Sequence, residues 1–202
     1  MSKKKFKRVL VVLGGTSGER AISFESGRAC AKALKKKKYS VSLFDPKFKN
    51  LNLIKKNSTD VIFNALHGKD GEDGIAQSYF EYLRIPYTHS GVISSYNSMN
   101  KVISKKIFIK NKILTPKYFI LDKNTFHSNI LKKNLKKKKI KFPIVLKPIN
   151  EGSSLGVEIL KSFSNLNRSA KYLLKKYEQI IVEQFIGGQE IQVAVLNNKS
   201  IG

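Results

Sequence analysis

The feature that most constrains the fold is an apolar run, RVLVVLGG at residues 8–15, which ends in two glycines. A short continuous apolar run indicates a strand that is buried on both faces, and the glycines indicate a tight loop after it. Two more strand-like segments follow, YSVSLFD at 39–45 and DVIFNALHG at 60–68. The first part of the chain is therefore expected to form a sheet with loops at the strand ends.

Helical patterns at 23–37 and 74–85 alternate with these strands, and the first is predicted to begin with Ser23 as its N-cap. Strands that alternate with helices predict an α/β fold with a mostly parallel sheet. Ligands of such sheets bind beyond the carboxyl ends of the strands. The loops GGTSGER at 14–20 and HGKDGEDG at 67–74 lie at those ends.

From about residue 92 the pattern changes, and one or two helices are predicted before Pro116. Further strand-like segments follow one another as neighbours, at 115–121, 141–148, 155–161, 179–186 and 190–197, with one helix at 164–178. Neighbouring strands predict an α+β arrangement with an antiparallel sheet and one or two helices on a face. We expect two domains, residues 1–92 and residues 93–202.

The net positive charge suggests a different class of function, nucleic-acid binding. The 202 residues include 39 Lys and Arg against 14 Asp and Glu, a net charge of +25, which is a reason to consider nucleic acid as a partner. The densest lysine run, at 132–141, is interpreted as solvated surface within 122–141, the segment expected to be most mobile. A basic nucleic-acid-binding module remains an alternative, but no nucleic-acid partner is expected.

Location is predicted from three features. No apolar stretch approaches the length that crosses a bilayer, so no membrane partner is expected. The basic start is not interpreted as a signal peptide, because Gly14 interrupts the apolar run and no small-residue cleavage site follows. The single cysteine, Cys30, cannot form an intrachain disulfide, as is usual in a reducing compartment. We expect a cytoplasmic protein.

Two loops at the predicted sheet edge carry candidate functional side chains. Glu19 could pair with a substrate ammonium, although a turn with a solvated glutamate explains the same residues equally well. His67 could bind a carboxylate or stabilise an oxyanion, and a purely structural role for this histidine explains the pattern equally well. The acidic residues that follow are consistent with caps for the next helix, namely Asp70, Glu72 and Asp73.

Two later segments suit a nucleotide. In KPINEGSSLGV, Lys147 offers a point charge and the backbone amides of Gly152 to Ser154 could wrap a phosphate, with Lys101 as a second charge. In EQFIGGQE, Glu183 and Glu190 could meet an adenine edge and a ribose. A hairpin turn and an ordinary connection are the competing interpretations. Walker A, G-x-G-x-x-G and G-x-S-x-G patterns are absent, and His and Cys are too sparse for a zinc site.

Taken in order, these motifs resemble D-alanine–D-alanine ligases of the ATP-grasp superfamily, from about Val9 to the end of the sequence. The matching segments are GGTSGER with the S-x-x-S-G that follows, HGKDGEDG, PYTHSGV, SMNKVISK, FPIVLKP, EGSSLGV and VEQFIGGQE. The resemblance implies an N-terminal α/β substrate-binding domain and then an ATP-grasp domain, comprising the small subdomain and only the beginning of the large one.

The implied activity uses ATP and Mg²⁺ to phosphorylate the carboxylate of one D-alanine. The amine of a second D-alanine then attacks the acyl phosphate, and the dipeptide serves peptidoglycan precursor synthesis. Two D-alanine molecules and ATP are the implied partners, and a homodimer is possible. Another ATP-grasp carboxylate–amine ligase is the nearest alternative.

The resemblance also assigns roles. Glu19 would bind the ammonium of the first D-alanine in a hydrogen-bond network with Ser153, and His67 would lie near the carboxyl end of the substrate pair. The residues implied to bind ATP are Lys101, Lys147, Glu151, Gly152, Ser154, Glu183, Gln184, Ile186 and Glu190.

The sequence departs from the family in two ways. Asn100 stands where family members usually have Asp, a change expected to have a small effect. The metal ligands and the arginine that stabilises the transferred phosphoryl group would lie beyond Gly202, so no metal ligand is expected in this chain. Phosphoryl transfer without them loses most of its electrostatic stabilisation, and we expect the 202 residues alone to be inactive or nearly so.

Overall fold

The computed structural model describes residues 6–201, and the chain divides into two compact units. The first unit comprises residues 1–115 with 147–156, and the second comprises 116–146 with 157–202. Compact units are defined by contacts and not by function, so the predicted domains 1–92 and 93–202 stay a prediction. No helix among the described residues is long and apolar enough to cross a membrane.

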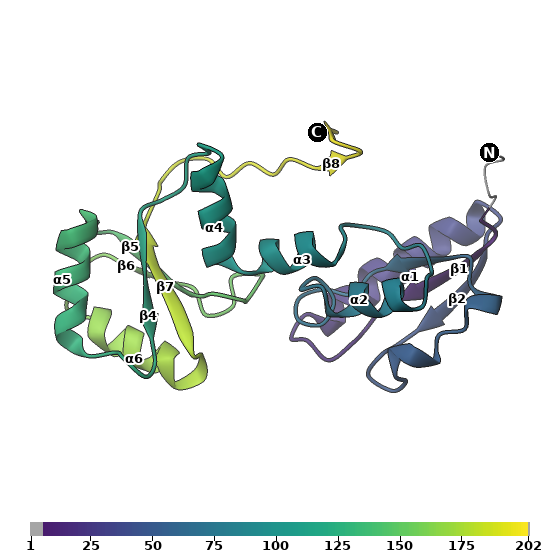
Figure 1. Cartoon of the computed structure of the whole chain (residues 1–202), viewed down its shortest axis with the longest axis horizontal. Helices are drawn as coiled ribbons and strands as arrows, with labels where there is room; N and C mark the ends of the chain where they lie inside the picture. The colour runs from purple at the N-terminus through teal and green to yellow at the C-terminus, as the bar shows by residue number, and fades with distance from the viewer. Residues whose placement is uncertain (1–5, 202) are drawn as a thin grey trace. The chain divides into compact units, whose positions relative to one another are not determined.

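The first unit is built on a parallel sheet, as predicted, and its strand order is β2-β1-β3 (Figure 1). Its elements are β1 (Arg8–Val12), α1 (Arg20–Lys36), β2 (Ser40–Phe44), η1 (Leu51–Leu53), η2 (Lys56–Ser58), β3 (Val61–Asn64), α2 (Ile75–Tyr82), α3 (Val92–Met99) and α4 (Lys101–Lys110). After α2, the chain pairs with β3 through a single bridge between Ile62 and Tyr87.

Strand β1 is central and buried on both faces, which explains its continuous apolar sequence. Successive side chains of a strand point to opposite faces. Val9 and Val11 belong to one apolar cluster with Ala31 of α1, and Leu10 and Val12 belong to another with residues of α2. The sheet of this unit is therefore covered by a helix on each side, and its strand ends carry the loops of interest.

The predicted N-cap of the first helix is wrong. Helix α1 begins at Arg20, one turn earlier than expected, and Glu19 occupies the N-cap position without a side-chain cap. Ser23 is fully buried, where its hydroxyl accepts a hydrogen bond from Gly14 N at 2.8 Å and donates one to Ala65 O at 2.6 Å. This serine links the segments that follow β1 and β3 because it faces the sheet.

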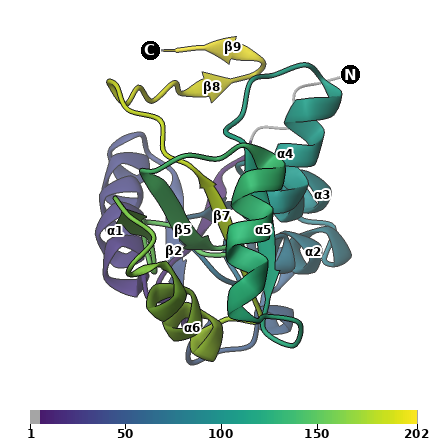
Figure 2. The same ribbon diagram turned by 90° about the vertical axis from the view of Figure 1, so that its left-hand side faces the viewer.

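The second unit contains a four-stranded sheet in the order β4-β7-β5-β6, with β4–β7 and β5–β6 antiparallel as predicted. Its elements are β4 (Tyr118–Asp122), α5 (Ser128–Lys138), β5 (Ile144–Pro148), β6 (Glu158–Leu160), α6 (Leu166–Lys176), β7 (Gln179–Gln184), β8 (Val195–Leu196) and β9 (Lys199–Ser200). Figure 2 shows α5 and α6 in front of this sheet, and both contribute to its core.

Helix α5 shows that the lysine run at 132–141 is not solvated surface throughout. Leu131 and Leu135 lie four residues apart, so they share one face of the helix, and both are buried in the core of the second unit. The lysines of the run occupy the other positions of the helix and are mostly exposed. A short amphipathic pattern was hidden among the many lysines.

The strand expected at 190–197 is also shorter than predicted, because only Val195–Leu196 forms β8. Asn197 and Asn198 form the turn that joins β8 to β9 in an antiparallel hairpin. Both asparagines have positive φ, 49° and 62°, which is the backbone that a two-residue hairpin turn of this kind requires.

Candidate active site

The loop after β1 is anchored at both ends, and this anchoring positions Glu19. Gly14 and Gly15 have φ of 87° and 73°, a left-handed backbone that residues other than glycine rarely adopt. Asp45 accepts a hydrogen bond from Gly15 N at 3.0 Å and forms an ion pair with Arg20 at 2.6 Å. Arg20 also donates to the carbonyl of Gly15 at 2.5 Å.

Burial alone would raise the pKa of Asp45. Hydrogen bonds from Arg20 and from the backbone amides of Lys47 and Gly15, with the charge of Arg20, outweigh burial and hold that pKa below its ordinary value. The Arg20–Asp45 pair was not predicted from the sequence. The arginine next to Glu19 was the only signal, and its partner lies 25 residues away.

Glu19 and Ser153 are brought together although 134 residues separate them. The Ser153 hydroxyl donates a hydrogen bond to Glu19 Oε1. Gly68 and Gly152 also lie beside this carboxylate: a methyl group added at Gly152 would be 3.5 Å from Glu19 Oε2, and one at Gly68 would collide with the same oxygen. The carboxylate thus lies where the loops after β1, β3 and β5 meet, all within the first unit.

The glycine–serine loop, residues 151–156, is a tight turn. Ser153, Ser154 and Gly156 all have a left-handed backbone, with φ of 44°, 60° and 69°. The turn is closed by a hydrogen bond from Leu155 N to Gly152 O at 2.9 Å. Two consecutive serines in this conformation are unusual, and residues in sparsely populated backbone regions cluster at functional sites.

Lys101 contacts the chain that enters this loop. Its backbone N donates to Ile149 O at 3.1 Å, and its ammonium donates to the carbonyls of Ile149, at 3.4 Å, and Glu151. Asn100 fixes the start of α4, because its Oδ1 accepts hydrogen bonds from Val102 N and Ile103 N at 3.1 and 3.0 Å. An asparagine is among the preferred N-cap residues, so the departure at this position preserves the cap.

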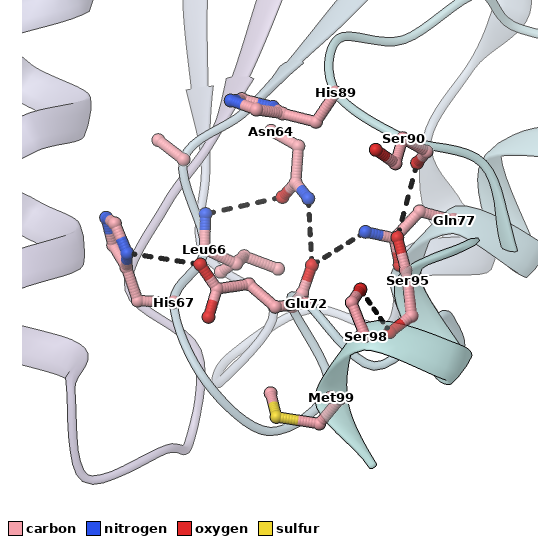
Figure 3. Close-up of a pocket in the computed structure, with 12 residues that line it drawn as sticks. Asn64, Leu66, His67, Glu72, Gln77, His89, Ser90, Ser95, Ser98 and Met99 are labelled. Atoms are coloured by element: carbon pink, nitrogen blue, oxygen red, sulfur yellow. Dashed lines mark hydrogen bonds and ion pairs between the residues drawn. The ribbon is translucent and has the colours of Figure 1, made fainter. Parts of the chain in front are cut away.

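His67 lies at the carboxyl end of β3, and both of its ring nitrogens have a neighbour. Nε2 is 3.1 Å from the Ser26 hydroxyl of α1, and Nδ1 is 3.5 Å from Glu72 Oε1, the contact drawn as a dashed line in Figure 3. The carbonyl of His67 accepts a hydrogen bond from the Ser17 hydroxyl at 2.7 Å. A cavity of about 350 Å³ adjoins this histidine, with Asn64, Gln77 and His89 in its walls.

The acidic residues of the 67–74 loop do not all cap α2. Asp73 does, because Oδ1 accepts a hydrogen bond from Ile75 N at 3.1 Å. Glu72 instead faces His67, and its Oε2 accepts from Gly68 N at 2.8 Å. Asp70 accepts a hydrogen bond from the Thr16 hydroxyl at 3.2 Å. The capping interpretation is therefore correct for one of the three.

The remaining predicted residues belong to strands β5 and β7 and to the segment after β7. Lys147 is half-buried at the penultimate position of β5. Glu183 is only 4% exposed near the end of β7, and the Gln184 amide exchanges hydrogen bonds of 2.9 Å with the backbone of Lys141. Ile186 and Glu190 are exposed. The ATP-binding roles of these residues stay predictions.

Residues 6–201 contain no group of three or more His, Cys, Asp or Glu side chains that could hold a metal ion. The expectation that the metal ligands lie beyond residue 202 stays a prediction.

A parallel α/β unit with loops at its strand ends, followed by an antiparallel sheet that carries two helices, is the ATP-grasp fold of D-alanine–D-alanine ligases. The family model described as D-ala D-ala ligase N-terminus matches residues 45–90, and the model described as D-ala D-ala ligase C-terminus matches residues 107–201. The chain belongs to the D-alanine–D-alanine ligase family.

Relatives and solved structures agree with this assignment. The D-alanine–D-alanine ligase of Pelagibacter ubique is 52% identical over 200 residues, which are 97% of this chain and 63% of the relative. That of Wolbachia pipientis is 41% identical over 194 residues, or 96% of this chain and 59% of the relative. The chain spans about three fifths of the length of these curated relatives.

Among solved structures, a crystal structure of D-alanine–D-alanine ligase from Bacillus anthracis superimposes with a TM-score of 0.84 at 33% identity, covering 96% of this chain and 62% of that one. The ligase from the same organism complexed with ATP gives a TM-score of 0.77 at 33% identity, with 90% and 60% covered.

Proposed function

We propose that this chain is part of an ATP-dependent ligase that joins two D-alanine molecules through an acyl phosphate to give D-alanyl-D-alanine for peptidoglycan precursors. The observation that carries the proposal is the hydrogen bond from Ser153 to Glu19. The resemblance required these two side chains to share one network, and no local pattern in the sequence links residues so far apart. Similarity to named ligases over 97% of the chain supports the same conclusion.

Within this proposal Glu19 binds the ammonium of the first D-alanine, because its carboxylate is placed where the loops after three strands meet. Ser153 holds that carboxylate in one orientation. His67 lies near the substrate carboxylate, with an imidazole that Ser26 and Glu72 flank. A charged amino acid needs both an acid and a base to bind it, and these residues supply them.

ATP would be held by the glycine–serine loop together with Lys101, Lys147, Glu183, Gln184, Ile186 and Glu190. The chemistry of these residues fits a nucleotide, since lysines suit phosphate oxygens and a turn of small residues lets backbone amides approach them. ATP supplies the phosphoryl group that activates a carboxylate. The described residues do not themselves fit Mg²⁺, because no group of three suitable side chains exists among them.

Several parts of the proposal rest on the resemblance alone. Residues 1–92 would form the substrate-binding domain and residues 93–202 would begin the ATP-grasp domain. A homodimer is likewise a family expectation, which light scattering coupled to gel filtration tests, whereas the cytoplasmic location is proposed from the sequence features given above.

The activity is tested in a chimera that joins these 202 residues to the remaining C-terminal part of the Pelagibacter ubique relative. We expect ADP release that depends on D-alanine, and we expect the 202 residues alone to release almost none. Glu19→Gln should raise KM for D-alanine about tenfold or more, because the substrate ammonium loses its charged partner. Glu25→Gln, the same change at an exposed glutamate of α1, serves as the matched control and should retain activity. ADP release by the chimera that does not respond to D-alanine would contradict the proposal.

A further inference from the structure

Ser26 belongs to the S-x-x-S-G segment after the first loop, and the proposed function gives it no task. It lies half-buried on α1. Its hydroxyl is 2.9 Å from Ile22 O and 3.4 Å from Ser23 O, both on its own helix, and 3.1 Å from His67 Nε2. A serine within a helix commonly bonds back to its own helix, but this one also reaches a histidine 41 residues away.

The opposite side of the imidazole faces Glu72. The carboxylate of Glu72 is 3.5 Å from Nδ1, and its second oxygen is fixed by the hydrogen bond from Gly68 N at 2.8 Å. A carboxylate has no proton to donate when it is ionised, so it favours the form of His67 that carries a proton on Nδ1. The tautomer of a histidine is set by what its other nitrogen contacts, and here Nε2 is left to Ser26.

A hydroxyl can serve Nε2 in either protonation state, because it has one proton to donate and lone pairs that accept. When His67 is neutral, with its proton on Nδ1, the Ser26 hydroxyl donates to Nε2. When His67 is an imidazolium, Nε2–H donates to Ser26 Oγ, and the hydroxyl proton turns to Ile22 O at 2.9 Å. Each state keeps a hydrogen bond at Nε2, and the ring does not rotate.

We propose that Ser26 is a positioning residue that holds the imidazole of His67 in a single orientation whether the ring is neutral or charged. Glu72 sets the tautomer, and Ser26 adapts to the proton. That this orientation serves a substrate carboxylate rests on the proposed function. The positioning itself does not depend on that function.

Other charged or titratable groups surround His67. Lys69 and Asp70 share a cavity with it, His89 shares another, and the Glu19 carboxylate lies beside the neighbouring Gly68. Among the contacts of the described residues, those to the ring nitrogens of His67 come from Ser26 and Glu72. Substitution of these two should therefore alter the imidazole most directly.

The test is a pair of nitrogen–proton correlation spectra of the imidazole rings in the 202-residue chain, at about pH 9 and about pH 5. The chain has three histidines, so His67→Gln assigns the signals. At the higher pH we expect a protonated Nδ1 and a bare Nε2. Ser26→Ala should shift the Nε2 resonance at both pH values, and Ser26→Thr should restore it, since threonine keeps a hydroxyl.

Ser78→Ala is the matched control. Ser78 is exposed on α2 and bonds back to Ile75 O at 2.7 Å, as Ser26 does on α1, but no histidine contact is described for it. It should leave the His67 signals unchanged. A neutral His67 that carries its proton on Nε2, or signals that Ser26→Ala does not move, would overturn the proposal.

The functional consequence is measured separately in the chimera. Ser26→Ala should raise KM for D-alanine about threefold to tenfold, the loss of one hydrogen bond, with little change in KM for ATP. If the imidazole spectra match the expectation but the chimera is inactive, the positioning role of Ser26 is supported and the proposed function is contradicted. An unchanged KM for D-alanine in an active chimera would overturn the link between the orientation of His67 and the substrate.

Discussion

Replacing Ser23 by alanine should destabilise the first unit by about 2–4 kcal/mol. The side chain is fully buried, and its hydroxyl serves two backbone groups. It accepts a hydrogen bond from Gly14 N at 2.8 Å and donates one to Ala65 O at 2.6 Å. Alanine fits the space but offers neither group a partner.

The magnitude follows from these two backbone groups. A buried donor or acceptor left without a partner costs about 1–3 kcal/mol, and Gly14 and Ala65 both belong to buried segments. Partial relaxation makes the combined loss smaller than the largest sum. The small cavity left by the hydroxyl adds little to it.

Urea unfolding followed by circular dichroism measures this change, with amide exchange of β1 reporting on the first unit alone. Ser78→Ala, which removes an exposed hydroxyl, should change stability by less than about 0.5 kcal/mol. If Ser23→Ala also cost less than about 0.5 kcal/mol with an unchanged m-value, the two backbone groups would not depend on this serine.

Three further predictions concern the first unit. Gly27→Ala would place a methyl group 2.7 Å from Leu13 Cβ, so it should cost about 1–3 kcal/mol in urea unfolding, and an unchanged midpoint would contradict the packing of α1 on the sheet. Burial raises the pKa of Asp45, but the hydrogen bonds from Arg20 and from backbone amides leave this pKa below the ordinary value of 3.8. The ionised Asp45 therefore stabilises the fold above about pH 4, and this stabilisation is lost as the pH falls through the pKa of the folded state. Asp45→Asn should remove that part of the acid sensitivity in a series of melts, and an identical pH profile would refute this. Burial and a carboxylate neighbour raise the pKa of Tyr87 to about 12, so its stabilisation is complete below about pH 10 and lost as the pH rises through 12. Absorbance titration should show one of the eight tyrosines ionising last, a step that Tyr87→Phe removes; a single transition near pH 10 would be the contrary result.

The sheets were predictable because buried strands require apolar residues, which are visible in the sequence. Residues 9–13 are apolar throughout since β1 meets a helix on each face. Helix α5 was not predicted, because Leu131 and Leu135 alone mark its buried face among lysines that any surface segment could carry. Ser23 misled the prediction of a helix start, since a serine that bonds the sheet looks the same in sequence as a cap.

The candidate site was predictable in its parts and not in its contacts. Glu19 and Ser153 were paired only through the family resemblance, as local chemistry left each loop ambiguous. The contact between Ser26 and His67 depends on where α1 crosses the end of β3, which the sequence does not specify. Glu72 was interpreted as a helix cap for the same reason, since capping depends on local spacing and its actual contact depends on the fold.

The central claim is that Glu19 and Ser153 act together at a D-alanine site. A double-mutant cycle on KM for D-alanine in the chimera tests it most directly, with Glu19→Gln, Ser153→Ala and the double variant. If the two side chains form one network, the double variant should be no worse than the more damaging single variant. Fully additive effects, or single variants that leave KM for D-alanine unchanged, would contradict the claim.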